Sequence, residues 1–175
     1  MRKISTIFAA CAAAIVLAAS AHAQVILKAS HQFPGGKGDV RDDMVQLIAK
    51  EAGAANVGLN VQVYPGASLF KPNQQWNAMV DGQLDISLFP LDYASGKVPA
   101  FSATLMPGLI RSQDRAKRVN DSQFMKDVRA EVEKNGVIVL SDAWFAGGMA
   151  SKTGCIIKPS DLKGAKFRAA GRHLF

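Results

Sequence analysis

The order of the expected elements predicts an α/β fold built around a parallel sheet. Residues 25–30 form a short apolar run that is typical of a first strand, and apolar and polar side chains alternate along residues 59–63. The segment between them has the spacing of a helix, so strand, helix and strand follow one another as in a crossover between parallel strands. Residues 137–140 are apolar without interruption, which predicts a later strand covered on both faces.

The first helix is expected over residues 39–53. Asp39 is a good N-cap, and Gly53 lies where a C-terminal cap is expected. Charged and polar side chains, Asp42 among them, are expected on the outer faces. The inner face is predicted by four apolar side chains at helical spacing, which are Val40, Met44, Leu47 and Ile48.

Further helices and a further strand are expected after the second strand. Residues 84–88 alternate like a third strand, and an apolar stripe beginning at Trp76 predicts a helix before it, with the stripe serving core packing. Ser112 and Ser122 are expected to cap two further helices, the second of which ends at residues 135–136.

The loops that follow the strands are the candidate pocket. Ligands of open α/β sheets bind beyond the carboxyl ends of the strands. Residues 67–73 follow the second expected strand and residues 89–93 follow the third, so both loops are candidates. In the latter, Tyr93 offers a hydroxyl to a ligand.

Residues 1–23 have the pattern of a signal peptide. Arg2 and Lys3 precede an apolar run, and residues 21–23 read A-H-A, which predicts cleavage after Ala23. The apolar run is too short and too rich in alanine for a membrane span. One cysteine, Cys155, then remains, so no internal disulfide is available, and its apolar neighbours predict a buried, inert thiol. We therefore expect an exported protein.

The composition excludes several classes of function. The hydrophobic content of 49% indicates a globular protein, and the net charge of +7 suits anionic small solutes. No lysine-rich run or mixture of aromatic and basic residues indicates a nucleic-acid partner. No nucleophile–base pair, clustered metal ligands or phosphate loop is present, so we expect neither an enzyme nor a cofactor or metal site.

The most informative stretch is residues 158–170, which read K-P-S-D-L-K-G-A-K-F-R-A-A. Pro159, Ser160 and Asp161 favour a turn or the start of a short helix, and Gly164 permits a tight bend. Residues 166–169 would then run out as a strand that holds Arg168. A guanidinium binds a carboxylate through two parallel hydrogen bonds, so Arg168 is the candidate for an acid group of a ligand, although a plain surface arginine fits the local sequence as well.

Several motifs in a fixed order resemble one family of receptors. L-K-A-S-H at residue 27 is followed by V-Q-V-Y-P-G-A-S-L at residue 61, W-N-A-M-V-D-G-Q-L-D-I at residue 76 and S-D-L-K-G-A-K-F-R at residue 160. Together they resemble the solute receptors of the tripartite ATP-independent periplasmic (TRAP) transporters, of the dicarboxylate-receptor type. Each motif alone is weak, but their order and spacing cover nearly all of the chain after the leader.

The resemblance implies a ligand site and partners. It implies that Arg168 forms the main salt bridge to the carboxylate of a small organic acid, and that the loop carrying His31 lines the cleft. It places Trp144 and Phe145 in the cleft as well, as an apolar wall. It also implies a location in the periplasm and a TRAP membrane permease as the partner that receives the solute.

The resemblance further implies a two-lobed periplasmic-binding-protein fold of the type II kind. Residues 24–121 would form the N-terminal part of lobe I, and residues 122–175 the first part of lobe II. Family members are considerably longer, so we expect this sequence to be an N-terminal half in which both lobes are incomplete.

Two other interpretations remain open on the sequence alone. The same α/β lobes would serve a solute-binding protein of an ATP-driven importer, which a neighbouring ATPase gene would favour. The chain could also be a truncated receptor fragment that binds nothing, which the missing polypeptide would favour.

Overall fold

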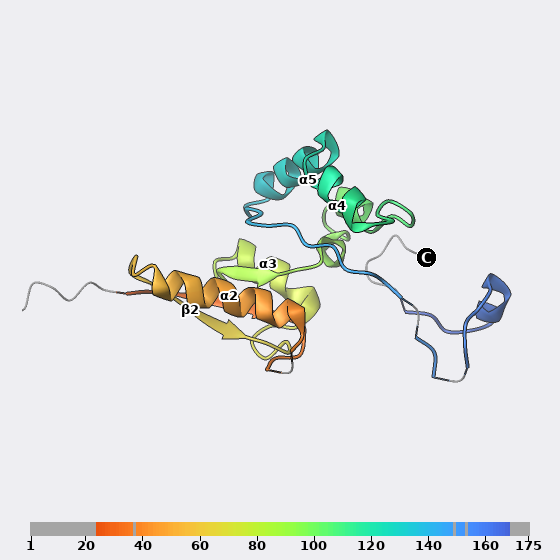
Figure 1. Cartoon of the computed structure of the whole chain (residues 1–175), viewed down its shortest axis with the longest axis horizontal. Coiled ribbons are helices and arrows are strands. Elements are labelled where there is room, and N and C mark those ends of the chain that lie inside the picture. Colours follow the sequence, from red (N-terminus) through yellow and green to blue (C-terminus); the bar gives the residue numbers. More distant parts are fainter. Residues whose placement is uncertain (1–23, 37, 149, 153, 169–175) are drawn as a thin grey trace, which may run out of the picture.

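The computed structural model describes residues 24–36, 38–148, 150–152 and 154–168, so the expected leader at residues 1–23 lies outside the described residues. The strands are β1 (Val25–His31), β2 (Leu59–Tyr64) and β3 (Ile86–Leu88). The α-helices are α2 (Val40–Ala54), α3 (Gln75–Val80), α4 (Gln113–Asn120) and α5 (Gln123–Lys134). Short 3-10 helices are η2 (Pro72–Gln74), η3 (Leu91–Ala94), η4 (Pro99–Leu105) and η5 (Pro159–Leu162). Figure 1 shows their arrangement.

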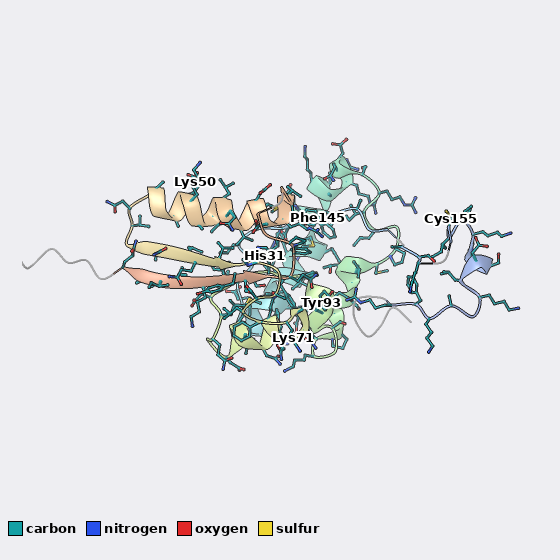
Figure 2. The ribbon with its side chains drawn as sticks, turned by 90° about the horizontal axis from the view of Figure 1, so that it is seen from below. His31, Lys50, Lys71, Tyr93, Phe145 and Cys155 are labelled. Carbon is teal, nitrogen blue, oxygen red and sulfur yellow. The ribbon has the colours of Figure 1, made fainter. Side chains whose placement is uncertain are left out.

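The predicted parallel sheet is confirmed. Its strand order is β2-β1-β3, and β1 runs parallel to both neighbours. Parallel neighbours require a crossover, and α2 provides the one between β1 and β2. Figure 2 shows α2 on one side of the strands and the yellow-green α3 on the other. One core cluster, built on Ala29, Val45 and Val61, joins α2 to the sheet.

The predicted inner face of α2 is wrong. Val40, Leu47 and Ile48 are 57%, 54% and 39% exposed. The buried face instead carries Asp42 and Val45, followed by Ala49 and Ala52. The large apolar side chains suggested that the helix turns its other face to the sheet. The small side chains of Ala49 and Ala52 let α2 approach the sheet closely, and the buried Asp42 has hydrogen-bond partners there. Gly53 is not the cap either, because the helix continues to Ala54 with Ala55 as its C-cap.

A second core cluster gathers on α3 and the segments after β3. Trp76, Ala94, Val98, Phe101 and Val132 are its buried members. The Trp76 and Phe101 rings meet edge to face, with centroids 5.1 Å apart. Val132 belongs to α5, so this helix packs on the same body as the elements before it. The predicted caps at Ser112 and Ser122 are confirmed, since each hydroxyl accepts a backbone N–H of its helix.

The segment after α5 lacks the two strands that the sequence predicted. Residues 137–140 and 166–168 form no strand. Val137 and Val139 pack on the core, whereas Ile138 and Leu140 are each 72% exposed, so only one side of the run is covered. A strand needs a neighbour to hydrogen-bond with, and this run is not paired with any of the three described strands.

The later part of the segment runs away from the sheet (Figure 1). Figure 2 shows Cys155 far from the strands, and this cysteine is free and exposed rather than buried as predicted. The turn at Pro159 is confirmed as the 3-10 helix η5, and Gly164 makes the expected bend with a φ of 76°. In the described part of the chain, no helix has the length and apolar character needed to cross a membrane.

The second cluster should contribute strongly to stability. Phe101 is fully buried against Trp76, and replacing a buried phenylalanine by alanine costs about 3–5 kcal/mol through lost burial and a cavity. We expect Phe101→Ala to lower the free energy of unfolding by that amount, measured by urea titration with tryptophan fluorescence. Leu105→Ala, on the same short helix but 46% exposed, is the control and should change it by less than about 0.5 kcal/mol. Equal effects of the two variants would contradict this account of the core.

Candidate functional site

Arg168 and Tyr93 meet although they lie 75 residues apart in the sequence. Nη2 of Arg168 donates a hydrogen bond of 2.7 Å to the Tyr93 hydroxyl. The guanidinium carbon also lies 5.7 Å from the centre of the Tyr93 ring, within the range of a cation–π contact. Arg168 is exposed and Tyr93 half-buried. Two residues that the sequence indicated separately as ligand candidates therefore form one polar group.

The body of the protein fixes the position of Tyr93. Tyr93 belongs to η3, between the buried residues Asp92 and Ala94. Its ring lies 6.2 Å from the Phe89 ring, which in turn lies 6.0 Å from Trp76. Tyr93 is thus the outermost member of an aromatic chain that begins in the second core cluster.

A hollow of about 470 Å³ adjoins Tyr93. Its wall combines amide, hydroxyl and ammonium groups with an aromatic ring, and it is lined among others by Asn73, Trp76, Asn77, Tyr93, Ser95 and Lys97. The amide, hydroxyl and ammonium groups are hydrogen-bond donors suited to an anionic solute. Its lining residues come from η2, α3 and the chain that follows β3.

His31 lies at the same edge of the sheet, as the last residue of β1, where it pairs in register with Leu88 at the end of β3. Its side chain is fully buried, and Nε2 lies 3.0 Å from Oδ1 of Asp42. Nδ1 accepts the backbone N–H of Phe33 at 3.3 Å. Since Nδ1 accepts this bond, Nε2 carries the proton and donates to Asp42. A direct contact of His31 with a solute stays a prediction, and its observed partners hold the first loop.

Asp42 is the residue of this network that the sequence analysis missed. It is only 3% exposed, and its carboxylate accepts the Gly36 backbone N–H at 2.9 Å and the Gln46 side-chain amide at 3.2 Å. The Gly36 bond is the main cause that lowers the pKa of Asp42, helped by Gln46 and His31 and opposed by burial. An aspartate at the start of a helix carries no local sign of burial, because Asp is common in first turns as a surface residue.

A second carboxylate, that of Asp39, lies at the end of the loop after β1. Arg41 binds Asp39 through Nε at 2.8 Å and Nη2 at 2.6 Å. The hydrogen bond from the Arg41 side chain lowers the pKa of Asp39 to about 2. The guanidinium of Arg41 also lies 4.1 Å from the centre of the Phe33 ring. Arg41 is therefore occupied within the loop.

The first loop also packs on the loop after β2. The Phe33 and His31 carbonyls accept the N–H groups of Gly66 and Ala67 at 2.8 and 2.9 Å. A Cβ at Gly35 would meet the Pro65 ring at 2.5 Å, so this approach requires glycine. The loops after β1 and β2 thus form one hydrogen-bonded rim at the carboxyl edge of the sheet.

Trp144 and Phe145 lie on the segment after α5. The indole N–H of Trp144 donates to Oδ1 of Asn120 at 2.6 Å, which ties the half-buried Trp144 to the end of α4. Phe145 is 48% exposed. Arg129 binds Asp142 just before them, which anchors the segment to α5. Within the described ranges, neither aromatic residue has a hydrogen bond or ring contact with Tyr93 or Arg168, so their place in a ligand wall stays a prediction.

The residues that the structure describes include no group of three or more His, Cys, Asp or Glu side chains that could hold a metal ion. Near Tyr93 the arginine and the lysine carry positive charge, and the amides and hydroxyls can donate hydrogen bonds, so this set of groups suits an anion. An open parallel sheet with anion-binding groups on the loops after its strands is the arrangement expected of an α/β solute-binding protein.

Comparison with known proteins gives the family. Residues 38–174 match the model of the bacterial extracellular solute-binding proteins, family 7, and the chain belongs to this family. A solute-binding protein of Albidiferax ferrireducens is 39% identical over 152 residues, which cover 85% of this chain and 45% of the relative. The chain thus spans about half the length of the relatives it matches.

Solved structures agree with this assignment. A TRAP periplasmic solute-binding protein from Rhodoferax ferrireducens, crystallised with bound malonate, is 39% identical with a TM-score of 0.74. The match covers 79% of this chain and 45% of that one. A TRAP periplasmic solute-binding protein from Sulfurospirillum deleyianum with bound succinate is 21% identical, with a TM-score of 0.59 over 65% of this chain and 36% of that one, and it supports the fold alone.

The buried carboxylate should be needed for stability in a pH-dependent way. Asp42→Asn puts an amide in place of a carboxylate that accepts three N–H groups, so we expect a loss of about 1–3 kcal/mol in the free energy of unfolding at neutral pH. The pKa of Asp42 is lower in the folded protein than in the unfolded chain, where it is about 4. Its ionised carboxylate therefore stabilises the fold above about pH 4, and this contribution is lost as the pH falls through the folded pKa. The difference between wild type and Asp42→Asn should therefore shrink as the pH falls from about 5 toward 2.

Asp43→Asn is the matched control, because Asp43 is the exposed neighbour of Asp42 on the same helical turn. Urea titrations across the pH range should give it the stability of the wild type. A similar loss in both variants, or a loss in Asp42→Asn that persists undiminished at low pH, would contradict the role of the buried carboxylate.

Proposed function

We propose that this protein is the extracytoplasmic receptor of a TRAP transporter and captures a small carboxylate for uptake. The observation that carries the proposal is the state of Arg168, the arginine of the S-D-L-K-G-A-K-F-R motif. Its guanidinium is exposed, its hydrogen-bond partner is the neutral Tyr93 hydroxyl, and no acidic side chain of the described residues forms a salt bridge with it. A cation held in place without a counter-charge suits an anionic ligand.

The relatives support the chemical class of the solute. The protein from Rhodoferax ferrireducens carries malonate and resembles this chain at 39% identity. A guanidinium can bind one carboxylate of such an acid through two hydrogen bonds. The amides and the ammonium group of the hollow beside Tyr93 supply further donors for the rest of the solute.

The proposed mechanism is closure of two lobes around the solute. Residues 24–121 would contribute to the first lobe together with α5, whose Val132 packs on the same core, and the chain after α5 would lead into the second lobe. Trp144 and Phe145 would cover the apolar part of the solute. Closure removes water from the guanidinium–carboxylate pair, which strengthens their attraction.

The family name and the leader pattern support a place outside the cytoplasm, in the periplasm, after cleavage behind Ala23. The partner would be the TRAP membrane permease, which takes the solute from the closed receptor. The 39% identity to a TRAP receptor favours this assignment over the ATP-driven importers. Binding and release need no chemical step, so we propose no enzymatic activity.

The test is calorimetric titration of the purified chain with malonate. We expect the wild type to bind malonate and Arg168→Ala to bind at least about 30-fold more weakly, because losing one partner of a desolvated charge pair costs about 2–5 kcal/mol. Arg118→Ala removes an exposed arginine of α4 and is the matched control, with unchanged affinity expected. Equal affinity of Arg168→Ala and the wild type would refute the assigned role of Arg168.

A further inference from the structure

The segment that carries Arg168 has little else to hold it. Residues 163–168 form no helix or strand, and Lys166, Phe167 and Arg168 are all exposed. The backbone hydrogen bonds next to them are local, from Lys163 to Ser160 and from Ala165 to Leu162. Within the described ranges, the hydrogen bonds and ring contacts that join residues 163–168 to the body of the protein are those of Arg168 with Tyr93. The position of the guanidinium therefore depends on this tyrosine.

Tyr93 is suited to holding Arg168 because the core of the protein fixes the position of the Tyr93 ring. The backbone N–H of Tyr93 donates to Pro90 at 3.1 Å, and its ring packs beside Phe89 at the edge of the aromatic chain that reaches Trp76. A rigid ring with its hydroxyl directed outward presents a fixed acceptor. It also presents its face to the cation at 5.7 Å.

The chemistry of the phenol adds a further reason. A carboxylate in this place would bind the guanidinium more strongly, but it would also neutralise the charge and compete with an anionic solute. A phenol hydroxyl accepts one N–H and leaves the net charge unchanged. One of the five guanidinium donors is used, so the others remain for a carboxylate, and the hydroxyl proton is still free to donate.

We propose that Tyr93 is the positioning residue of Arg168: it holds the guanidinium at the carboxyl edge of the sheet, charged and accessible, before the solute arrives. This inference rests on the proposed function for its purpose, but the contact itself can be tested without any solute. It assigns Tyr93 a role that acts through Arg168, in addition to the direct ligand contact that the sequence suggested.

The first measurement uses an arginine-specific dicarbonyl reagent, with the modified residues identified by mass spectrometry. A guanidinium engaged with Tyr93 reacts slowly, so in the wild type we expect Arg168 to react more slowly than the exposed Arg118 in the same sample. Tyr93→Phe keeps the ring and removes the hydroxyl, and it should raise the rate at Arg168 several-fold while leaving Arg118 unchanged. Equal rates at Arg168 in the wild type and Tyr93→Phe would overturn the proposal, as would a wild-type Arg168 that reacts as fast as Arg118.

Tyr64→Phe is the matched control, since it removes the hydroxyl of the other tyrosine, which donates to Gln62 rather than to an arginine. In malonate titrations we expect Tyr93→Phe to bind about tenfold more weakly than the wild type, the effect of losing one hydrogen bond to a charged group, and Tyr64→Phe to bind normally. Equal affinities for the two variants would overturn the positioning role. If the wild type does not bind malonate at all, the proposed function fails for this solute, and the reagent rates still decide the contact.

Discussion

The hydrogen bond between His31 and Asp42 is the constraint on which the sheet edge depends. Asp42 lies in the first turn of α2, so bonding it to the end of β1 fixes the rotation of the helix. That rotation presents Val45 and the small side chains after it to the sheet and leaves Val40 and Leu47 in solvent. The larger apolar side chains stay exposed so that the buried Asp42 carboxylate can make its hydrogen bonds. A buried carboxylate without partners would be strongly destabilising.

The same carboxylate connects the core with the rim of the candidate site. Asp42 also holds Gly36, so the loop after β1 is tied to the helix that the sheet positions. His31 pairs in register with Leu88, and the chain after Leu88 leads directly through Phe89 to Tyr93. The hydrogen-bond network of His31 and Asp42 thus supports the loop after β1, and the aromatic rings of Phe89 and Trp76 support Tyr93 after β3. Both lie at the carboxyl edge of the sheet. This explains how a sheet of three short strands can present a fixed set of donors.

The sequence predicted those parts of the fold that depend on local signals. The patterns of the first three strands and the side-chain caps at Asp39, Ser112 and Ser122 need only a few neighbouring residues, and the structure confirms them. The inner face of α2 was wrong because it depends on a partner from another element, and the strand at residues 137–140 was wrong because a strand needs a neighbour. Arg168 and Tyr93 could each be selected from the sequence, but no periodicity links residues 75 positions apart.

The arginines of the structure show why a neutral partner matters. Arg41 and Arg129 each bind a carboxylate, Asp39 and Asp142, and their charges are used to fix a loop and a segment. Arg168 is held by a phenol instead, so its charge is still available to an incoming acid. A solute carboxylate would add a Coulombic attraction that Tyr93 does not supply, and the attraction grows as water leaves the pair. Arg111 and Arg115 also donate to neutral acceptors, the backbone carbonyls of Gly108 and Leu109, so the proposed role of Arg168 rests on its neutral side-chain partner together with its place in the S-D-L-K-G-A-K-F-R motif.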